Sequence, residues 1–596
     1  MLSVIINWIY LCATAFLLGT AFSRLVRRWF GWEMNNSVEV LFYGLICATV
    51  YAQIFSLFGG VGMLANGILA VFCAAAAVMW RKPAWKMLRR SIKESGRAHC
   101  LIVAALVFIW AYCTSRGYMH YDSDLYHAQS IRWIEEYGVV PGLGNIHVRF
   151  AYNSSFFALS ALYSMAFLGG QSLHTVNGFF ALLLSVEVLK LFRLRRFRMP
   201  YSLKRTGANG DGQTRTGRNR GWQKHLEEGV DATAGQKQFR LSDFARFGAL
   251  YYLTILYRDI VAPASDYAVM CVVFLIVIRW LVHLEQKEKS IAPYALLCVA
   301  GVYAVTLKLT AGVILLLTIK PAYLLIKEKK YRQIALYIAL GLLVLAPWIL
   351  RTALISGYLL YPFPALDVLS ADWKIPAEAA ARDAAEIRTW GRGLNDASLV
   401  GMPLSKWFPH WFSTMLPTLG KLFVAADLVC IALWLCQLAT SVIRWKKKKT
   451  VQGEWDELLV LSGVVLSYGF WQLSAPLLRY GYAYVLLVIV LTAGVIYRKL
   501  HLPVAADRLL GAAVVLFTAV KALAFVNYAV SVSDEPYYVA QQDYGTYELD
   551  SFMAEDVCFY IPKSGDRVGY EPFPAIPAKV EIRFRGSGIK SGFRRQ

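Results

Sequence analysis

The segment from Tyr118 to Asn153 concentrates side chains that could do acid–base chemistry between two apolar stretches. It contains Asp122, Asp124, Glu135, Glu136, His120, His127 and His147, in a chain of which only 17% is charged. Transfer of a group to a hydroxyl needs a carboxylate to take the proton and a cation to steady the leaving anion. This segment is therefore the first candidate for a reaction site, placed at a membrane surface.

The local pattern predicts a helix that begins at Asp122 or Ser123 as its cap and stops at Gly138. One face of this helix would carry Tyr126, Ser130, Trp133, Ile134 and Tyr137, which predicts an amphipathic helix lying in the membrane interface. Asp122 and Asp124 would sit at its positive N-terminal end, which favours the ionised form. The plainer alternative is that the two aspartates merely cap a loop helix.

Three further polar segments fall on the same expected side of the membrane. Arg258 and Asp266 bound the connection between two apolar segments, either ending helices or facing a cavity. Lys308 interrupts an apolar stretch, where it either snorkels or binds phosphate as a point charge. Arg479, in WQLSAPLLRYG, has no acidic neighbour in sequence and is either a phosphate clamp or a headgroup anchor.

Two weaker patterns remain open. Asp122, Asp124, His120 and His127 leave room for a divalent cation, although their spacing matches no helix-borne metal motif, and no other cofactor is indicated. The loop from Arg351 to Leu416 carries aromatic residues such as Trp390 and Trp407. Aromatic side chains in a polar loop suit sugar stacking, but an interfacial aromatic belt is the commoner explanation.

The motif D-x-D-L-Y-H, followed by a short amphipathic helix, the turn Gly138-Val-Val-Pro141 and a polar return to the membrane, resembles the first external loop of GT-C superfamily glycosyltransferases. The resemblance covers about a quarter of the chain, and three spans rather than one precede the loop. It implies that Asp122 is the catalytic base, assisted by Asp124, and that the donor is a polyprenyl-phosphate-linked sugar.

The resemblance also assigns roles to the other positions. Lys308 and Arg479 would bind the donor phosphate, and His127, Tyr126, Asp266 and Arg258 would contact the substrate, a glycan or lipid acceptor. The late A-P-x-x-R-Y pattern around Arg479 is similar to patterns in membrane glycosyltransferases.

Composition indicates the elements that must position these residues. The chain is 57% hydrophobic with a mean hydropathy of +0.45, which predicts an all-α polytopic membrane protein. We expect a GT-C-like bundle of roughly 12 to 13 transmembrane helices with external loops and a small external C-terminal module. The net charge of +23 fits basic loops rather than nucleic acid, because the aromatic residues lie in spans instead of alternating with the basic clusters.

Basic clusters orient the chain. The loops at 81–97, 193–240, 327–332 and 444–449 are rich in Lys and Arg and should face the cytoplasm of a bacterial inner membrane. This threading requires that Ser154 to Leu168 does not cross and forms a half-embedded outer helix. The expected regions are helices at 1–117, an external loop at 118–172, helices at 173–350 with a disordered cytoplasmic loop at 195–243, an external loop at 351–417, helices at 418–530 and an external tail at 531–596.

Two other functions stay open from the sequence. A transporter or flippase for lipid-linked glycans would show inverted repeats and charges near the membrane midplane. An O-antigen ligase or polymerase would share the external site and lipid-linked substrate, and the large loop at 351–417 suits it.

Overall fold

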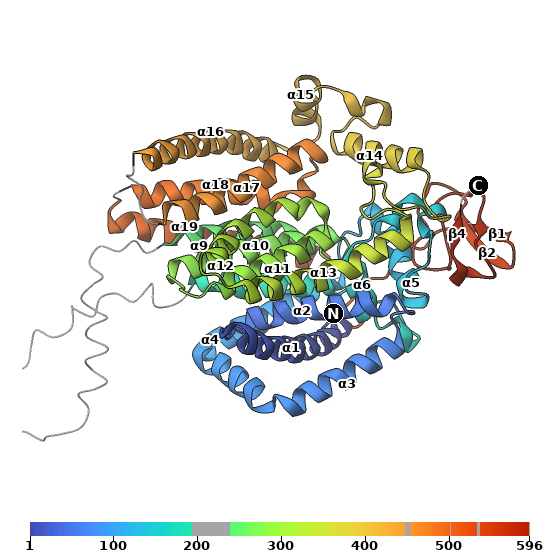
Figure 1. The fold of residues 1–596 in the computed structure, drawn as a ribbon, viewed down its shortest axis with the longest axis horizontal. Coiled ribbons are helices and arrows are strands. Elements are labelled where there is room, and N and C mark those ends of the chain that lie inside the picture. The colour runs from blue at the N-terminus through green and yellow to red at the C-terminus, as the bar shows by residue number, and fades with distance from the viewer. Residues whose placement is uncertain (193–238, 448–452, 501, 533–536, 595–596) are drawn as a thin grey trace, which may run out of the picture.

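The computed structural model describes residues 1–192, 239–447, 453–500, 502–532 and 537–594. Figure 1 shows a bundle of long helices, with α5, α14, α15 and the strands β1, β2 and β4 gathered toward one end. Of the disordered loop expected at 195–243, residues 195–238 lie outside the described residues. Residues 241–243, the last three of that expected loop, belong to the helix α9 (Leu241–Leu256). The Asp243 carboxylate accepts a hydrogen bond from the Arg240 backbone N–H.

Among the described residues, ten helices are long and apolar enough to cross a membrane, or eleven if one bent pair counts as a span. They are α1 (Leu2–Phe30), α2 (Ser37–Ser56), the Gly96–Ser115 part of α4 (Arg81–Ser115), α10 (Ser265–Glu285), η7 (Leu309–Thr318) with α12 (Ile319–Lys327), α13 (Tyr331–Ser356), α16 (Thr418–Lys446), α17 (Glu454–Ser474), α18 (Tyr482–Lys499) and α19 (Val504–Ser531). The bent pair joins α3 (Met63–Met79) to Arg81–Lys93 at 84°. This set is compatible with a multi-pass membrane protein.

The expected number of roughly 12 to 13 spans would require shorter buried helices to cross as well. Candidates are α7 (Val176–Val188), α9 and α11 (Ala292–Leu307), which pack around α10. α10 is the centre of the bundle, since 89% of its apolar window is buried, against 6% for α19. A helix buried on all sides reads as a continuous apolar run, which is how α10 reads.

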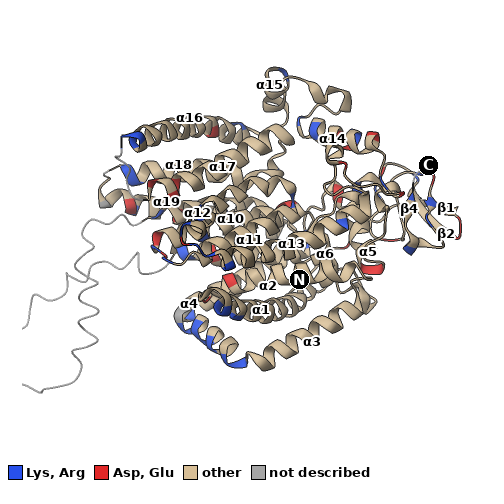
Figure 2. Cartoon of the chain, in the orientation of Figure 1, with Lys and Arg blue, Asp and Glu red and all other residues tan. Residues whose placement is uncertain are grey.

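Charge separates the two ends of the bundle. Arg27 and Arg28 end α1, Arg444 and Lys446 end α16, and Arg498 and Lys499 end α18. Figure 2 shows these blue segments away from the strands, and we name this the basic end. The opposite end, with α5 (Ala128–Glu136), α14 (Ala377–Gly391) and the strands, is the loop end.

The helices α5 and α6, between α4 and α7, are mostly buried in the protein rather than interfacial. α6 (Ser155–Tyr163) has nine residues, too short to cross a membrane, and all of them are buried. It was expected to lie half-embedded in lipid, but it packs against α2 and α5 inside the protein. α5 likewise buries Ser130, Trp133 and Ile134, so the expected interfacial face is a protein contact.

The C-terminal tail covers that face of α5. Gln129 donates from its amide to the carbonyl of Gly569 at 3.1 Å, and Arg132 pairs with Glu571 at 2.6 Å. The tail contains two small antiparallel sheets, one of β1 (Leu549–Ala554) with β2 (Val557–Pro562) and the other of β3 (Arg583–Phe584) with β4 (Phe593–Arg594). Strands were expected near 557–561 and 580–584, but their docking on α5 was not.

The loop at 351–417 begins later than expected and is largely helical. Arg351 to Ser356 belong to α13, so the connection starts at Gly357. It contains α14 and α15 (Leu404–Thr414). The carbonyl of Leu473 in α17 accepts from Arg392, just after α14, at 3.2 Å, and this bond ties the loop to the bundle.

A buried ion network occupies the basic end. Arg279 of α10 donates to Glu39 of α2 at 2.7 Å. Arg246 of α9 pairs with Glu187 of α7 at 2.8 Å and with Asp243 at 3.0 Å. Removing one partner from such a network leaves a buried charge uncompensated, at a cost of about 3–5 kcal/mol. The network therefore holds four helices in register at this end.

Candidate active site

Four charged side chains from separate parts of the chain meet at the loop end. Arg479 forms ion pairs with Asp122 and, at 3.5 Å between Nε and Oδ2, with Asp266. Asp266 also pairs with Lys308. Two acids and two cations therefore form one continuous and charge-balanced chain, which we call the Arg479 cluster.

Backbone breaks place each member of the cluster. Asp266 lies in the first turn of α10 and is buried. Lys308 is the extended residue between α11 and η7. Arg479 lies in the short helical turn Leu478–Tyr480 that joins α17 to α18. Helix ends meet at one end of a bundle, so connections far apart in sequence can share a site.

Tyr480 links the two cations. Arg479 donates to the Tyr480 hydroxyl at 3.1 Å, and the Lys308 ammonium lies 3.2 Å from the centre of the Tyr480 ring. A cation over an aromatic face is stabilised by the ring quadrupole. Lys308 is thus held toward Arg479 rather than extended to a lipid headgroup, which was the simpler reading of its sequence.

Asp122 does not cap the helix that follows it. Its carboxylate faces Arg479, and the residues after it, Ser123–His127, form a π-helical turn that leads into α5. Burial works to raise the pKa of Asp122, but the Arg479 guanidinium outweighs it and lowers the pKa. The carboxylate is therefore ionised at neutral pH.

His120 completes the cluster as a neutral imidazole. Arg479 donates to His120 Nδ1 at 3.2 Å, so in the neutral tautomer Nε2 carries the proton and donates to the Tyr267 hydroxyl. Burial, reinforced by Arg479, lowers the pKa of His120 to about 4. Sequence reasoning placed His120 only in a metal group, since nothing local indicates Arg479 as its partner.

This imidazole gives a pH prediction. A folded-state pKa of about 4, below the ordinary 6.5, means that the folded protein keeps the imidazole neutral above about pH 4. The unfolded chain protonates it below about pH 6.5, so stability falls as pH drops from 6.5 toward 4. We expect His120→Gln to leave the shape of the activity profile unchanged between about pH 5 and pH 8. Rates measured across that range for both proteins check this, and a wild-type inflection near 6.5 that His120→Gln removes would contradict it.

A cavity of about 330 Å³ opens beside the cluster. Its charged wall consists of Asp122, Arg479 and His120, and its rim carries the aromatic side chains of Tyr118, Tyr121 and Trp390. Polar groups converging in an otherwise apolar pocket are typical of ligand sites. Trp390 belongs to α14, so the loop at 357–417 contributes to the same cavity.

Asp124 is separated from Asp122 and holds the tail. Its carboxylate accepts from Gly545 N–H at 3.0 Å and from Tyr547 OH at 2.8 Å, and its carbonyl accepts from Val568 and Gly569. Burial raises the pKa of Asp124 despite those two donors, opposite to the direction expected from a helix N-terminus. In the structure Asp124 therefore binds the C-terminal tail, whereas the sequence predicted that it assists Asp122.

Asp124→Ala is expected to weaken tail docking by about 1–3 kcal/mol, because two donors lose a buried acceptor. Limited proteolysis within residues 543–570 should become faster, while the exposed control Asp550→Ala should match wild type. Loss of activity in Asp124→Ala with a fully protected tail would instead favour the catalytic role expected from sequence.

His127 and Tyr126 border the cluster without a direct contact to its cations. His127 is buried, packs on Tyr126 and Phe157, and has no hydrogen-bond partner for Nδ1 among the described residues. Burial lowers its pKa to about 4, with Asp122 the strongest opposing charge. Neither residue is among those that line the cavity.

Arg258 points away from the cluster. Its guanidinium is exposed and packs on the rings of Tyr257 and Tyr528, at 5.5 and 5.2 Å. Its carbonyl accepts from Tyr118 N–H at 2.8 Å, so its backbone fixes the start of the reactive loop. The Arg258 side chain was expected to contact the substrate, but the structure does not bring it together with the other site residues.

A second polar group lies behind Tyr126. Arg149 pairs with the buried Asp383 of α14 at 3.4 Å, and Asp383 also accepts from Tyr152 at 2.5 Å and Tyr361 at 3.0 Å. Arg149 also lowers the pKa of Asp122 slightly, so its charge reaches the site. Arg149 and Asp383 are more than 200 residues apart in the chain, so no local sequence pattern indicates that they pair.

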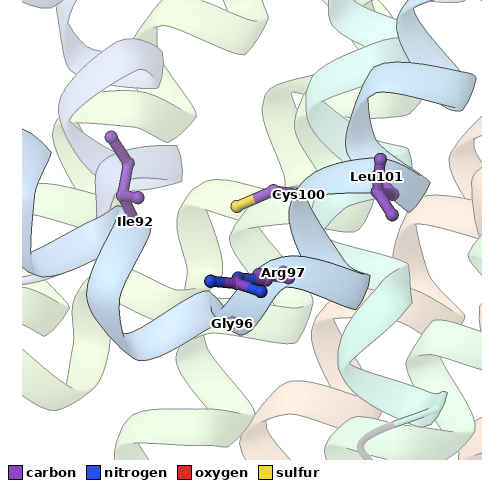
Figure 3. A pocket seen from close by; sticks show the side chains of 5 residues that line it. All are labelled: Ile92, Gly96, Arg97, Cys100 and Leu101. Carbon is purple, nitrogen blue, oxygen red and sulfur yellow. The ribbon is translucent and has the colours of Figure 1, made fainter.

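Two further observations concern cations and cavities. Within the described part of the chain, no group of three or more His, Cys, Asp or Glu could hold a metal ion. A second cavity of about 570 Å³ lies beside Ile92, Gly96, Arg97, Cys100 and Leu101, as Figure 3 shows. Gly96 begins the span that ends at Ser115, so this cavity is roughly 30 Å from the loop end.

The fold and the cavity define a helical protein, compatible with multiple membrane crossings, that carries a charged site at one end. A family model described as a domain of unknown function (DUF8201) matches residues 1–202 and 228–486, and the chain belongs to this family. The matched region includes all four members of the Arg479 cluster and ends before the tail. No curated protein and no solved structure matches the chain.

Proposed function

We propose that the protein is an integral membrane glycosyltransferase of GT-C architecture in a bacterial inner membrane. It transfers a sugar from a polyprenyl-phosphate donor to a cell-envelope glycan or lipid acceptor on the external face. The observation that supports this proposal is the meeting of Asp122, Asp266, Lys308 and Arg479, which brings two carboxylates and two cations together.

The proposed reaction uses these groups in one displacement. The acceptor oxygen forms a bond to the anomeric carbon while the bond from that carbon to the phosphate oxygen breaks. Asp122 takes the acceptor proton, and polyprenyl phosphate leaves with its charge held by Arg479 and Lys308. General base catalysis by a positioned side chain typically raises the reaction rate by about 10²–10⁴-fold. Electrostatic stabilisation of the leaving anion also raises the rate by orders of magnitude.

Donor binding would release the base. Before substrate arrives, Arg479 is shared between Asp122 and Asp266, so its charge is fully compensated. A phosphate on Arg479 competes for the same guanidinium and neutralises the charge that lowers the pKa of Asp122. The carboxylate then becomes a stronger base at the moment when the donor is present.

The test uses the purified full-length protein in liposomes with a panel of radiolabelled polyprenyl-phosphate sugars. We expect release of polyprenyl phosphate from at least one donor together with a new glycosidic bond in the acceptor. A panel without turnover in the presence of crude envelope lipid and glycan acceptors would refute the proposal.

A flippase for lipid-linked glycans is the second candidate, favoured by the closed ion network at the basic end. Arg279 with Glu39, together with Arg246 and Glu187, places buried charges between helices at the end opposite the Arg479 cluster. Buried charges between membrane helices are typical of transport pathways. Movement of a fluorescent lipid-linked glycan between leaflets without a new glycosidic bond would favour this candidate.

A further inference from the structure

The rim of the cavity holds three exposed aromatic side chains around a charged wall. Trp390 is 54% exposed, Tyr118 60% and Tyr121 43%, and all three line the cavity that Asp122 and Arg479 face. Large aromatic surfaces left open beside convergent polar groups mark binding sites more often than isolated exposed residues do.

Trp390 is held in place by the residues that follow it. A side chain at Gly391 would lie 2.8 Å from the Ala475 backbone, so the end of α14 touches the connection that carries Arg479. Arg392 donates to the carbonyls of Val400 at 3.0 Å and Leu473 at 3.2 Å, and it stacks on the buried Trp407. The backbone that carries the exposed indole is therefore fixed at the end of α14.

The chemistry of the rim and the wall matches one ligand class. A pyranose ring offers a face of C–H groups that packs on an aromatic ring, and its hydroxyls need hydrogen-bond partners. Asp122 accepts, Arg479 donates, and neutral His120 lies beside them. An acyl chain would use the aromatic rim but would offer no hydrogen-bonding group to the charged wall.

We propose that this rim is a carbohydrate subsite that seats the acceptor sugar, with Trp390 as its stacking platform. The inference rests on the proposed function, because it places the acceptor hydroxyl next to Asp122. It adds that the acceptor presents a sugar ring rather than a bare lipid hydroxyl. Tyr118 and Tyr121 line the same cavity.

The experiment measures binding separately from transfer. Saturation-transfer NMR on the detergent-purified full-length protein uses neutral methyl glycosides of common hexoses and N-acetylhexosamines as probes. We expect saturation of the C–H face of at least one glycoside by wild type, a decrease of about fivefold or more in Trp390→Ala, and retention in Trp390→Phe. Thermal unfolding of each variant checks that the fold is intact.

The matched control is Trp445, an indole 61% exposed at the basic end of α16. Trp445→Ala should bind the glycosides as wild type does. Unchanged binding in Trp390→Ala, an equal decrease in Trp445→Ala, or no saturation of any glycoside by wild type would overturn the subsite.

The outcomes also separate this inference from the proposed function. Glycoside binding that depends on Trp390, in a protein that turns over no donor, keeps the subsite and removes the transferase. Donor turnover that depends on Asp122, without glycoside binding, keeps the transferase and removes the subsite.

Discussion

Replacing Asp122 by Asn is expected to reduce sugar transfer by about two to four orders of magnitude, because the acceptor proton loses its base. The shape of the side chain is kept and Arg479 retains Asp266 as a partner, so the fold should persist. Release of polyprenyl phosphate from the active donor, measured at equal protein in liposomes, gives the rate.

Glu136→Gln is the matched control for this variant. Glu136 is an exposed acid at the end of α5, and its replacement removes the same charge from the same loop region. It should transfer at the wild-type rate. A wild-type rate in Asp122→Asn would remove Asp122 from the reaction, whatever else the cluster does.

Arg479→Gln is expected to lower both the stability and the activity of the protein. It leaves Asp122 and Asp266 without their shared guanidinium, at a cost of about 3–5 kcal/mol for the broken buried pair. It also removes the cation nearest the base, so the rate of donor use should fall by at least about 100-fold. Thermal unfolding in detergent and donor turnover measure the two effects separately.

A double variant distinguishes the two effects of Arg479. Asp122→Asn combined with Arg479→Gln removes both charges of one pair and should recover part of the stability but none of the activity. Arg258→Gln, which changes an exposed arginine outside the cluster, should match wild type in both measurements. Full activity in Arg479→Gln would exclude Arg479 as the phosphate ligand.

The helical architecture followed from hydropathy because long apolar runs leave the backbone few alternatives in a membrane. The number of spans could not be predicted from hydropathy, because α7, α9 and α11 are shorter than a full crossing and are buried by their neighbours. α6 shows the same limit. Its length ruled out a crossing, but its burial inside the protein depends on contacts with α2 and α5 that no local pattern encodes.

The site was partly predictable because charge is costly in a membrane. Asp266, Lys308 and Arg479 stood out as polar residues at the ends of apolar segments, and one threading put them on the same side as Asp122. Their pairing was not visible, and Arg479 was taken as unpaired. The roles of Asp124 and His120 could not be read because their partners, Gly545 and Arg479, lie hundreds of residues away.

The spacing of the Arg479 cluster along the chain has a consequence for biogenesis. Arg479 follows Asp122 by 357 residues, which ribosomes synthesise in tens of seconds at roughly 5–20 residues per second. Asp266 and Lys308 are 42 residues apart and can enter the bilayer as a neutral pair, whereas Asp122 waits for its guanidinium until α17 and α18 have been inserted. A nascent chain therefore has an uncompensated acid until residue 479 of its 596 residues has been made, and a chain that stalls earlier keeps it.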